Sequence, residues 1–121
     1  MNSDELTSLI CSFIFEKKGY DIKTLDVRNL TTMTDYFIIC SADSDPQLRA
    51  IADHIDTELK ERGIKVWHKE GMQSLNWVLI DLVDVVVHIF KPESRNFYGL
   101  ERLWGDAVIT EIKDKISSPT K

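Results

Sequence analysis

The sequence predicts an α/β fold in which helices pack on a mixed sheet of five strands. Apolar residues recur at three- and four-residue spacing over 6–14 and 48–59, which is the pattern of helices with one buried face. Nearly continuous apolar runs at 35–41 and 85–90 are typical of buried strands. Because strands and helices alternate in a chain of 121 residues, we expect one domain.

The first half of the chain predicts two helices and two strands. Ser3 can cap the first helix and Gly19 can close it, and strands are expected over 22–28 and 35–41. A second helix should begin at Pro46, with Asp45 as its N-cap, because a residue before proline avoids helical angles. Gly63 should end that helix.

The second half predicts three strands and one more helix. The strands are expected over 64–69, 77–82 and 85–90, and the last two are close enough for a hairpin, although its turn around Val83 lacks a glycine. A short helix should follow Pro92. Its spacing places Phe97, Leu100 and Trp104 on a core face, and Arg95, Tyr98 and Arg102 on a solvated face. We expect the domain to span 1–107 and a tail to span 108–121, a frayed helix before a disordered end.

Charge and composition restrict the classes of function. The formal net charge of −5 argues against a general phosphate-binding surface, so we expect little direct nucleic-acid contact and a partner with basic side chains. Cys11 and Cys40 form no metal or disulfide pattern and are expected to be buried free thiols. No secretion signal, organelle-import pattern or membrane-spanning run is recognisable, which predicts a cytoplasmic protein without a membrane partner.

One short stretch is a candidate active site. Asp43 and Asp45 form an Asp-x-Asp between a strand and a helix, and paired carboxylates of this kind hold Mg²⁺ against a phosphate in nucleotidyltransferases. The alternative is that Asp45 caps the helix and Asp43 is a solvated loop residue. The loop has no glycine to bring backbone amides close to a phosphate. The three histidines show no metal-ligand spacing, and no cofactor is expected.

The aromatic residues near the end of the chain predict a docking surface. Tyr98 lies beside arginines on the expected solvated face, and Trp77 begins a strand after a polar loop. Acidic groups nearby are suited to a cationic partner. His88 alternates with apolar residues on a strand, which is typical of a half-buried structural histidine. The partner-binding set expected here is Trp77, Tyr98, Glu70, Asp81, His88, Arg95 and Arg102.

Two long segments, DYFIICSADSDPQLRAIAD and EGMQSLNWVLIDLVDVVVHIFKPESRNFYGLERLWGD, resemble the ribosomal silencing factor family, also called the Iojap family. The resemblance runs from about residue 5 to residue 106. It implies a fold related to nucleotidyltransferases, without known catalysis. It also implies binding to the large ribosomal subunit through its ribosomal protein number fourteen, which blocks joining of the small subunit and represses translation under nutrient limitation.

The chain departs from that family at two positions. Family members usually have glycine in the hairpin turn where this chain has Val83, and an acidic residue where it has Gly99. Gly99 is expected to destabilise its helix by up to about 1 kcal/mol. The favoured interpretation is a steric anti-association factor and not an enzyme. The alternatives are a Mg-dependent nucleotidyltransferase using Asp43 and Asp45, and a homodimeric scaffold paired through a strand edge.

Overall fold

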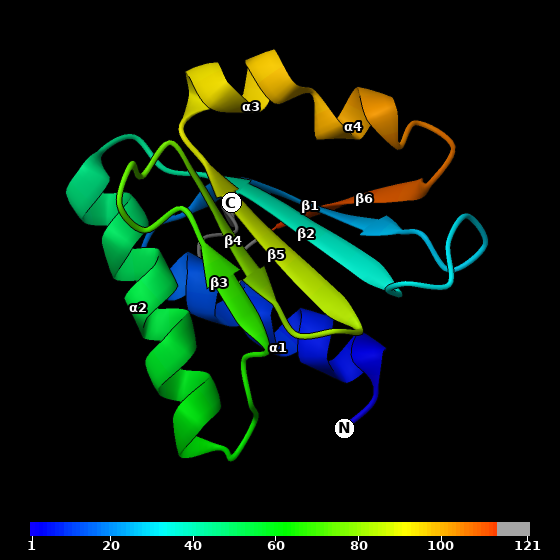
Figure 1. Ribbon diagram of the computed structural model, residues 1–121, viewed down its shortest axis with the longest axis horizontal. Coiled ribbons are helices and arrows are strands. Elements are labelled where there is room, and N and C mark those ends of the chain that lie inside the picture. The colour runs from blue at the N-terminus through cyan, green and yellow to red at the C-terminus, as the bar shows by residue number, and fades with distance from the viewer. Residues whose placement is uncertain (114–121) are drawn as a thin grey trace, which may run out of the picture.

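The protein, described here by a computed structural model over residues 1–113, is a six-stranded sheet with helices on both sides (Figure 1). Its order along the chain confirms the α/β class. The elements are α1 (Ser3–Glu16), β1 (Tyr20–Asp26), β2 (Tyr36–Ser41), α2 (Asp45–Glu61), β3 (His68–Glu70), β4 (Trp77–Asp81), β5 (Val85–Phe90), α3 (Pro92–Tyr98), α4 (Leu100–Leu103) and β6 (Val108–Ile112).

The sheet has the strand order β3-β4-β5-β2-β1-β6, with β2 and β5 parallel and the other neighbours antiparallel. The predicted hairpin is therefore the pair β4–β5. The prediction of five strands is wrong, because residues 108–112 form β6 and pair with β1. The expected frayed helix at this place is wrong for the same reason. The remainder of the expected tail, residues 114–121, lies outside the described residues.

The caps of the two long helices differ by one residue from those expected. Asn2 caps α1, since its side-chain oxygen accepts from the Glu5 amide at 2.8 Å while the Glu5 carboxylate accepts from the Asn2 amide at 3.0 Å. Ser44, not Asp45, caps α2 and accepts from the Gln47 amide at 3.2 Å. Asp45 is thus the first residue of α2, where a carboxylate suits the positive end of the helix.

Two apolar clusters hold the layers together. The larger one lies between the sheet and the pair α1 and α2, and it includes the inward residues of β2, β4 and β5. The smaller one lies on the other side, where Leu25, Ile39 and Phe90 meet residues of α4 and the turn after it. Cys11 and Cys40 are free and buried as predicted, and burial raises the pKa of both thiols.

The last helical segment is not the continuous helix that the spacing predicts. Gly99 adopts φ 57°, which ends α3 and starts α4 at a new angle. Because α3 and α4 are separate helices, Phe97 of α3 does not share a face with Leu100 and Trp104; it is 79% exposed, and the prediction of a core position for it is wrong. Leu100 and Trp104 do pack on the smaller cluster. Among residues 1–113, no helix is long and apolar enough to cross a membrane.

Candidate docking site

The sheet face that carries α3 and α4 contains an apolar groove of about 570 Å³. Alternation along the strands directs Trp77, Leu79 and Asp81 of β4 and Val86 and His88 of β5 to this face. Apolar side chains dominate the lining, and Phe37, Trp67, Trp77 and Trp104 are its aromatic members, which favours contact with an apolar surface of another molecule. We call this feature the aromatic groove, and it is lined by Thr31, Met33, Thr34, Phe37, Trp67, Trp77, Leu79, Asp81, Val83, Val86, His88, Leu100 and Trp104.

Trp77 lies at the centre of an aromatic cluster beside the groove. Its ring centroid is 4.6 Å from that of Tyr98 and 5.0 Å from that of Phe90. Its indole Nε1–H donates to Nδ1 of His88 at 3.0 Å. Tyr98 is 49% exposed, whereas Trp77 is half-buried. Trp77 and Tyr98, which the sequence analysis placed in one docking surface, are therefore in contact, and Tyr98 is the more exposed of the two.

His88 lies in the floor of the groove and is 5% exposed. Burial lowers its pKa to about 4, so the imidazole is neutral at physiological pH. Because Nδ1 accepts from Trp77, the proton of the neutral ring lies on Nε2. His88 is hydrogen-bonded as expected of a structural histidine, but it is buried more deeply than the half-buried position expected from the sequence, and burial of this degree does not suit a direct contact with a partner.

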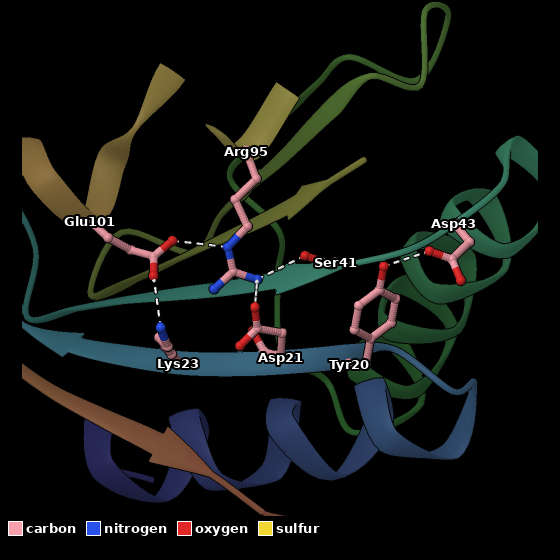
Figure 2. A network of polar contacts seen from close by, with 7 residues as sticks. All are labelled: Tyr20, Asp21, Lys23, Ser41, Asp43, Arg95 and Glu101. Carbon is pink, nitrogen blue, oxygen red and sulfur yellow. Dashed lines mark hydrogen bonds and ion pairs between the residues drawn. The ribbon is translucent and has the colours of Figure 1, made fainter. Parts of the chain in front are cut away.

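The candidate metal-binding carboxylates are held by neighbouring side chains. Asp43 accepts from the Tyr20 hydroxyl at 2.5 Å, and Asp45 forms an ion pair with Lys91 (Figure 2 shows the first of these contacts). Over residues 1–113, no three metal-ligating side chains are grouped so that they could hold an ion. The contacts with Tyr20 and Lys91 are suited to stabilising the strand end and the start of α2.

Arg95 occupies a place that sequence spacing did not predict. Its side chain is 7% exposed and points across the ends of β1 and β2, instead of lying on a solvated face (Figure 2). It donates to Ser41, to the main-chain carbonyl of Asp21 and to Glu101. The expectation of a solvated arginine is wrong because the helix is short and the break at Gly99 changes which side faces the sheet.

The remaining predicted residues are scattered around the site. Asp81 lines the groove and accepts from the Val83 amide at 2.8 Å within the hairpin turn. Glu70 is exposed on the edge strand β3 and pairs with His68 at 2.6 Å. Arg102 is exposed on α4 with its guanidinium beside Gly99. Neither Glu70 nor Arg102 lines the aromatic groove.

Several groove residues were not expected from the sequence. Trp67 is 67% exposed and Met33 is 84% exposed, although both are large apolar side chains. Phe37 packs edge-on against His88 and Trp104, at 5.3 and 5.1 Å between ring centroids. The alternation of β4 does indicate which of its residues share a face, but only the tertiary structure shows that Phe37 of β2 and Trp67, which precedes β3, line the same groove.

Fold and site together define an α/β binding domain whose most distinctive surface is an aromatic groove beside two short helices. All of residues 1–121 match the family described as "Ribosomal silencing factor during starvation". The chain belongs to this ribosomal silencing factor family, and its role is therefore in the regulation of translation.

Individual relatives agree with this assignment. Ribosomal silencing factor RsfS of Bacillus subtilis is 40% identical over 93% of this chain and 95% of its own length. The chloroplastic protein Iojap of Zea mays is 39% identical over 80% of this chain and 42% of its own length. "Mitochondrial assembly of ribosomal large subunit protein 1" of Mus musculus is 30% identical over 79% of this chain and 43% of its own length.

A crystal structure of a Chromobacterium violaceum protein has the same fold, with a TM-score of 0.84 and 34% identity. The match covers 98% of this chain and 95% of that one. The fold described above is thus one that has been observed by crystallography in a related chain.

Proposed function

We propose that the protein silences translation by binding the large ribosomal subunit through its ribosomal protein number fourteen and sterically blocking the small subunit. The family description names ribosomal silencing during starvation, which supports a role under nutrient limitation. The name of the mouse relative refers to the large ribosomal subunit, which supports that subunit as the partner. A cytoplasmic location follows from this function.

The aromatic groove is the observation that carries the proposal. Interface hot spots are enriched in tryptophan and tyrosine, and they lie in pockets that become desolvated on binding. The groove has Trp67 and Met33 exposed at its rim and the Trp77–Tyr98 aromatic pair beside it. Asp81 adds a negative charge at the same face, in a chain of net charge −5. These features suit a ribosomal protein, which has cationic side chains because it lies among phosphates.

We assign the predicted contact residues to three roles. Trp77, Tyr98 and Asp81 contact the partner directly, since they lie in or beside the groove and retain solvent exposure. Glu70 and Arg102 are exposed outside the lining of the groove and contribute charge at its periphery. His88 and Arg95 are buried and act on the surface through the residues they hold.

The mechanism requires no chemical step. Asp43 and Asp45, the residues of the nucleotidyltransferase alternative, are held by Tyr20 and Lys91. We propose a topology related to nucleotidyltransferases in which these carboxylates have a structural role. We also propose that residues 1–113 form one domain, because β6 completes the sheet through its pairing with β1.

Truncation of Trp67 tests the docking site with little disturbance of the fold. Because its ring is 67% exposed, Trp67→Ala should leave the melting temperature near that of the parent. Co-sedimentation with isolated large subunits should become weaker by about 2 kcal/mol if Trp67 is an interface hot spot.

Val108→Ala is the matched control, because Val108 is 68% exposed on β6, at the edge of the sheet away from β3. It should bind like the parent. Equal binding by Trp67→Ala, Val108→Ala and the parent would exclude the aromatic groove as the docking surface. Failure of the parent itself to pellet with large subunits would reject the proposed partner.

A homodimeric scaffold is the second candidate, and the outer edge of β6 favours it. Within residues 1–113, β6 pairs only with β1, and its Val108 and Ile109 are exposed. Such an edge can add a strand from a second copy. Sedimentation equilibrium across a dilution series tests this candidate, and a single mass equal to that of one chain at all concentrations would reject it.

A further inference from the structure

A buried arginine connects one of the two short helices to the ends of two strands. Arg95 of α3 donates through Nη1 to the Asp21 carbonyl at 2.7 Å and to Ser41 Oγ at 2.8 Å (Figure 2). Its Nε donates to Glu101 Oε1 at 2.9 Å. One guanidinium thus contacts β1, β2 and α4 at once, from a side chain that is only 7% exposed.

The backbone of β1 is distorted at the point where it meets this arginine. Asp21 has φ 52°, although it is not a glycine, and the pairing of β1 with β2 shifts register between Tyr20 and Lys23. A left-handed residue within such an irregularity redirects its peptide groups. Here the redirected Asp21 carbonyl accepts from Arg95, while the Asp21 carboxylate lies 3.5 Å from the same guanidinium. The distortion therefore provides the arginine with its acceptor.

Glu101 extends the network from the strands to α4. Its second carboxylate oxygen accepts from Lys23 Nζ of β1 at 3.1 Å, so the carboxylate is held between two cations (Figure 2). The hydrogen bond from Arg95 lowers the pKa of Glu101 below its ordinary value, with Lys23 as a smaller cause. We call this group, Arg95 with Asp21, Ser41, Glu101 and Lys23, the Arg95 clamp.

The clamp holds the segment that forms one wall of the aromatic groove. α3 has seven residues and α4 has four, and helices of this length are not stable without tertiary contacts. Two residues of the surface lie between Arg95 and Glu101 in the sequence. Tyr98 packs on Trp77, and Leu100 lines the groove. A displacement of the segment would therefore displace the aromatic surface.

We propose that the Arg95 clamp positions the wall of the docking groove, and that Arg95 and Glu101 are positioning residues for partner binding. This inference rests on the proposed function, because the binding in question is that of the large ribosomal subunit. The clamp occupies the strand end beside Asp43 and Asp45, which the sequence marked as a candidate catalytic centre. In this chain the polar side chains at that strand end hold the binding surface in place, and they do not themselves contact the partner.

The fork geometry of arginine is essential to the clamp. A guanidinium donates in several fixed directions, whereas an ammonium is a single point charge on a flexible stem. Arg95→Lys keeps the charge but cannot reach Glu101, Ser41 and the Asp21 carbonyl together. A buried ion network often contributes more to a specific arrangement than to overall stability. Arg95→Lys therefore tests whether the geometry of the guanidinium contacts, and not the positive charge alone, is needed to hold the segment in place.

The test compares Arg95→Lys with Arg62→Lys. Arg62 makes an exposed ion pair with Glu58 on α2, so the same chemical change is made far from the groove. Two quantities are measured in the folded temperature range: affinity for isolated large subunits, and the ring-proton shifts of Tyr98, which report its packing against the Trp77 ring at 4.6 Å between centroids. Arg95→Lys should weaken binding about tenfold, equal to about 1.4 kcal/mol, and move the Tyr98 shifts toward free tyrosine. Arg62→Lys should change neither.

A second variant keeps the inference testable if Arg95→Lys does not fold. Glu101→Gln retains the shape of the side chain at a half-buried position, and it should reproduce both effects more weakly. Unchanged binding and unchanged Tyr98 shifts in a folded Arg95→Lys or Glu101→Gln variant would overturn the inference. If the parent does not bind large subunits, the proposed function fails, while the Tyr98 shifts still decide whether the clamp positions the segment.

Discussion

At the scale of single residues, Val83 has a backbone conformation that its side chain disfavours. It has φ 75° in the turn between β4 and β5, and a β-branched residue rarely adopts this region. The turn is held by three hydrogen bonds: the Val83 amide donates to the Asp81 carboxylate, the Leu82 amide donates to the Val85 carbonyl, and the Asp84 amide donates to the Leu82 carbonyl. These contacts maintain the conformation in spite of the side chain. Glycine, which has no Cβ, is free of that steric cost.

We therefore expect Val83→Gly to stabilise the protein. Relief of the strained backbone is worth on the order of 1–3 kcal/mol, and the greater flexibility of glycine in the unfolded chain offsets part of it. The net gain should be about 1 kcal/mol, since the Val83 side chain is half exposed and its loss removes little buried surface. Urea unfolding of the parent, Val83→Ala and Val83→Gly measures the effect. A glycine variant no more stable than the parent would contradict the strain argument.

At the scale of elements, Gly99 separates α3 from α4. Its φ of 57° is the left-handed conformation in which helices commonly end, and its amide donates to the Arg95 carbonyl at 3.0 Å. The expectation that this glycine weakens a continuous helix is therefore wrong. The residue terminates one helix and reorients the next, which allows Leu100 and Trp104 to pack on the smaller apolar cluster.

Replacing this glycine should destabilise the protein. Gly99→Ala places a Cβ in a left-handed backbone, at a cost of about 1–2 kcal/mol. The Cβ would lie 2.4 Å from Arg102 Nη2, but that atom ends a flexible side chain and can move. Gly63→Ala is the control, because Gly63 has φ 73° at the end of α2 with no atom near its Cβ position. Thermal melting should show similar losses for both, whereas only Gly99→Ala should change the Tyr98 ring-proton shifts. Unchanged shifts in Gly99→Ala would contradict its role in orienting α4.

Elements with a clear hydrophobic period were predictable, and those fixed by distant contacts were not. α2 and β5 follow directly from their apolar residues, and the observed β5 has the predicted bounds. β6 has no such signal, because four of its five residues are exposed and its stability comes from pairing with β1. The burial of Arg95 likewise depends on β1 and β2, far away in the sequence. Spacing alone therefore assigned it to the wrong face.

The docking surface was predictable only in part, because some of its residues are close in the sequence and others come together only through distant contacts. Trp77 and Tyr98 were expected to act together, and the structure brings their rings into contact. The composition of the short segment that carries Tyr98 indicated an aromatic surface. The rest of the groove is assembled from strands that are neighbours only in the sheet, as with Phe37 of β2 and Leu79 of β4. The order of the strands in the sheet cannot be read from a single sequence.

At the scale of the whole molecule, the buried His88 links stability to pH. Burial lowers its pKa to about 4, whereas the unfolded chain has an ordinary histidine of pKa about 6.5. Between these two values the unfolded state binds a proton that the folded state does not. The free energy of unfolding therefore falls as the pH decreases below about 6.5, and this contribution levels off below about pH 4, where the folded protein also becomes protonated.

His88→Asn should remove this pH dependence. Asparagine can still accept from Trp77 through its side-chain oxygen, but it does not titrate. Between about pH 7 and pH 5 the parent should lose about 2 kcal/mol more stability than the variant. Glu101 and Asp26 have pKa values lowered by their arginine partners, so the stability they contribute is lost only at more acidic pH. Urea unfolding at a series of pH values measures the free energy of unfolding of both proteins. If this free energy depends on pH in the same way in parent and variant, His88 is not the group that makes the folded protein sensitive to acid.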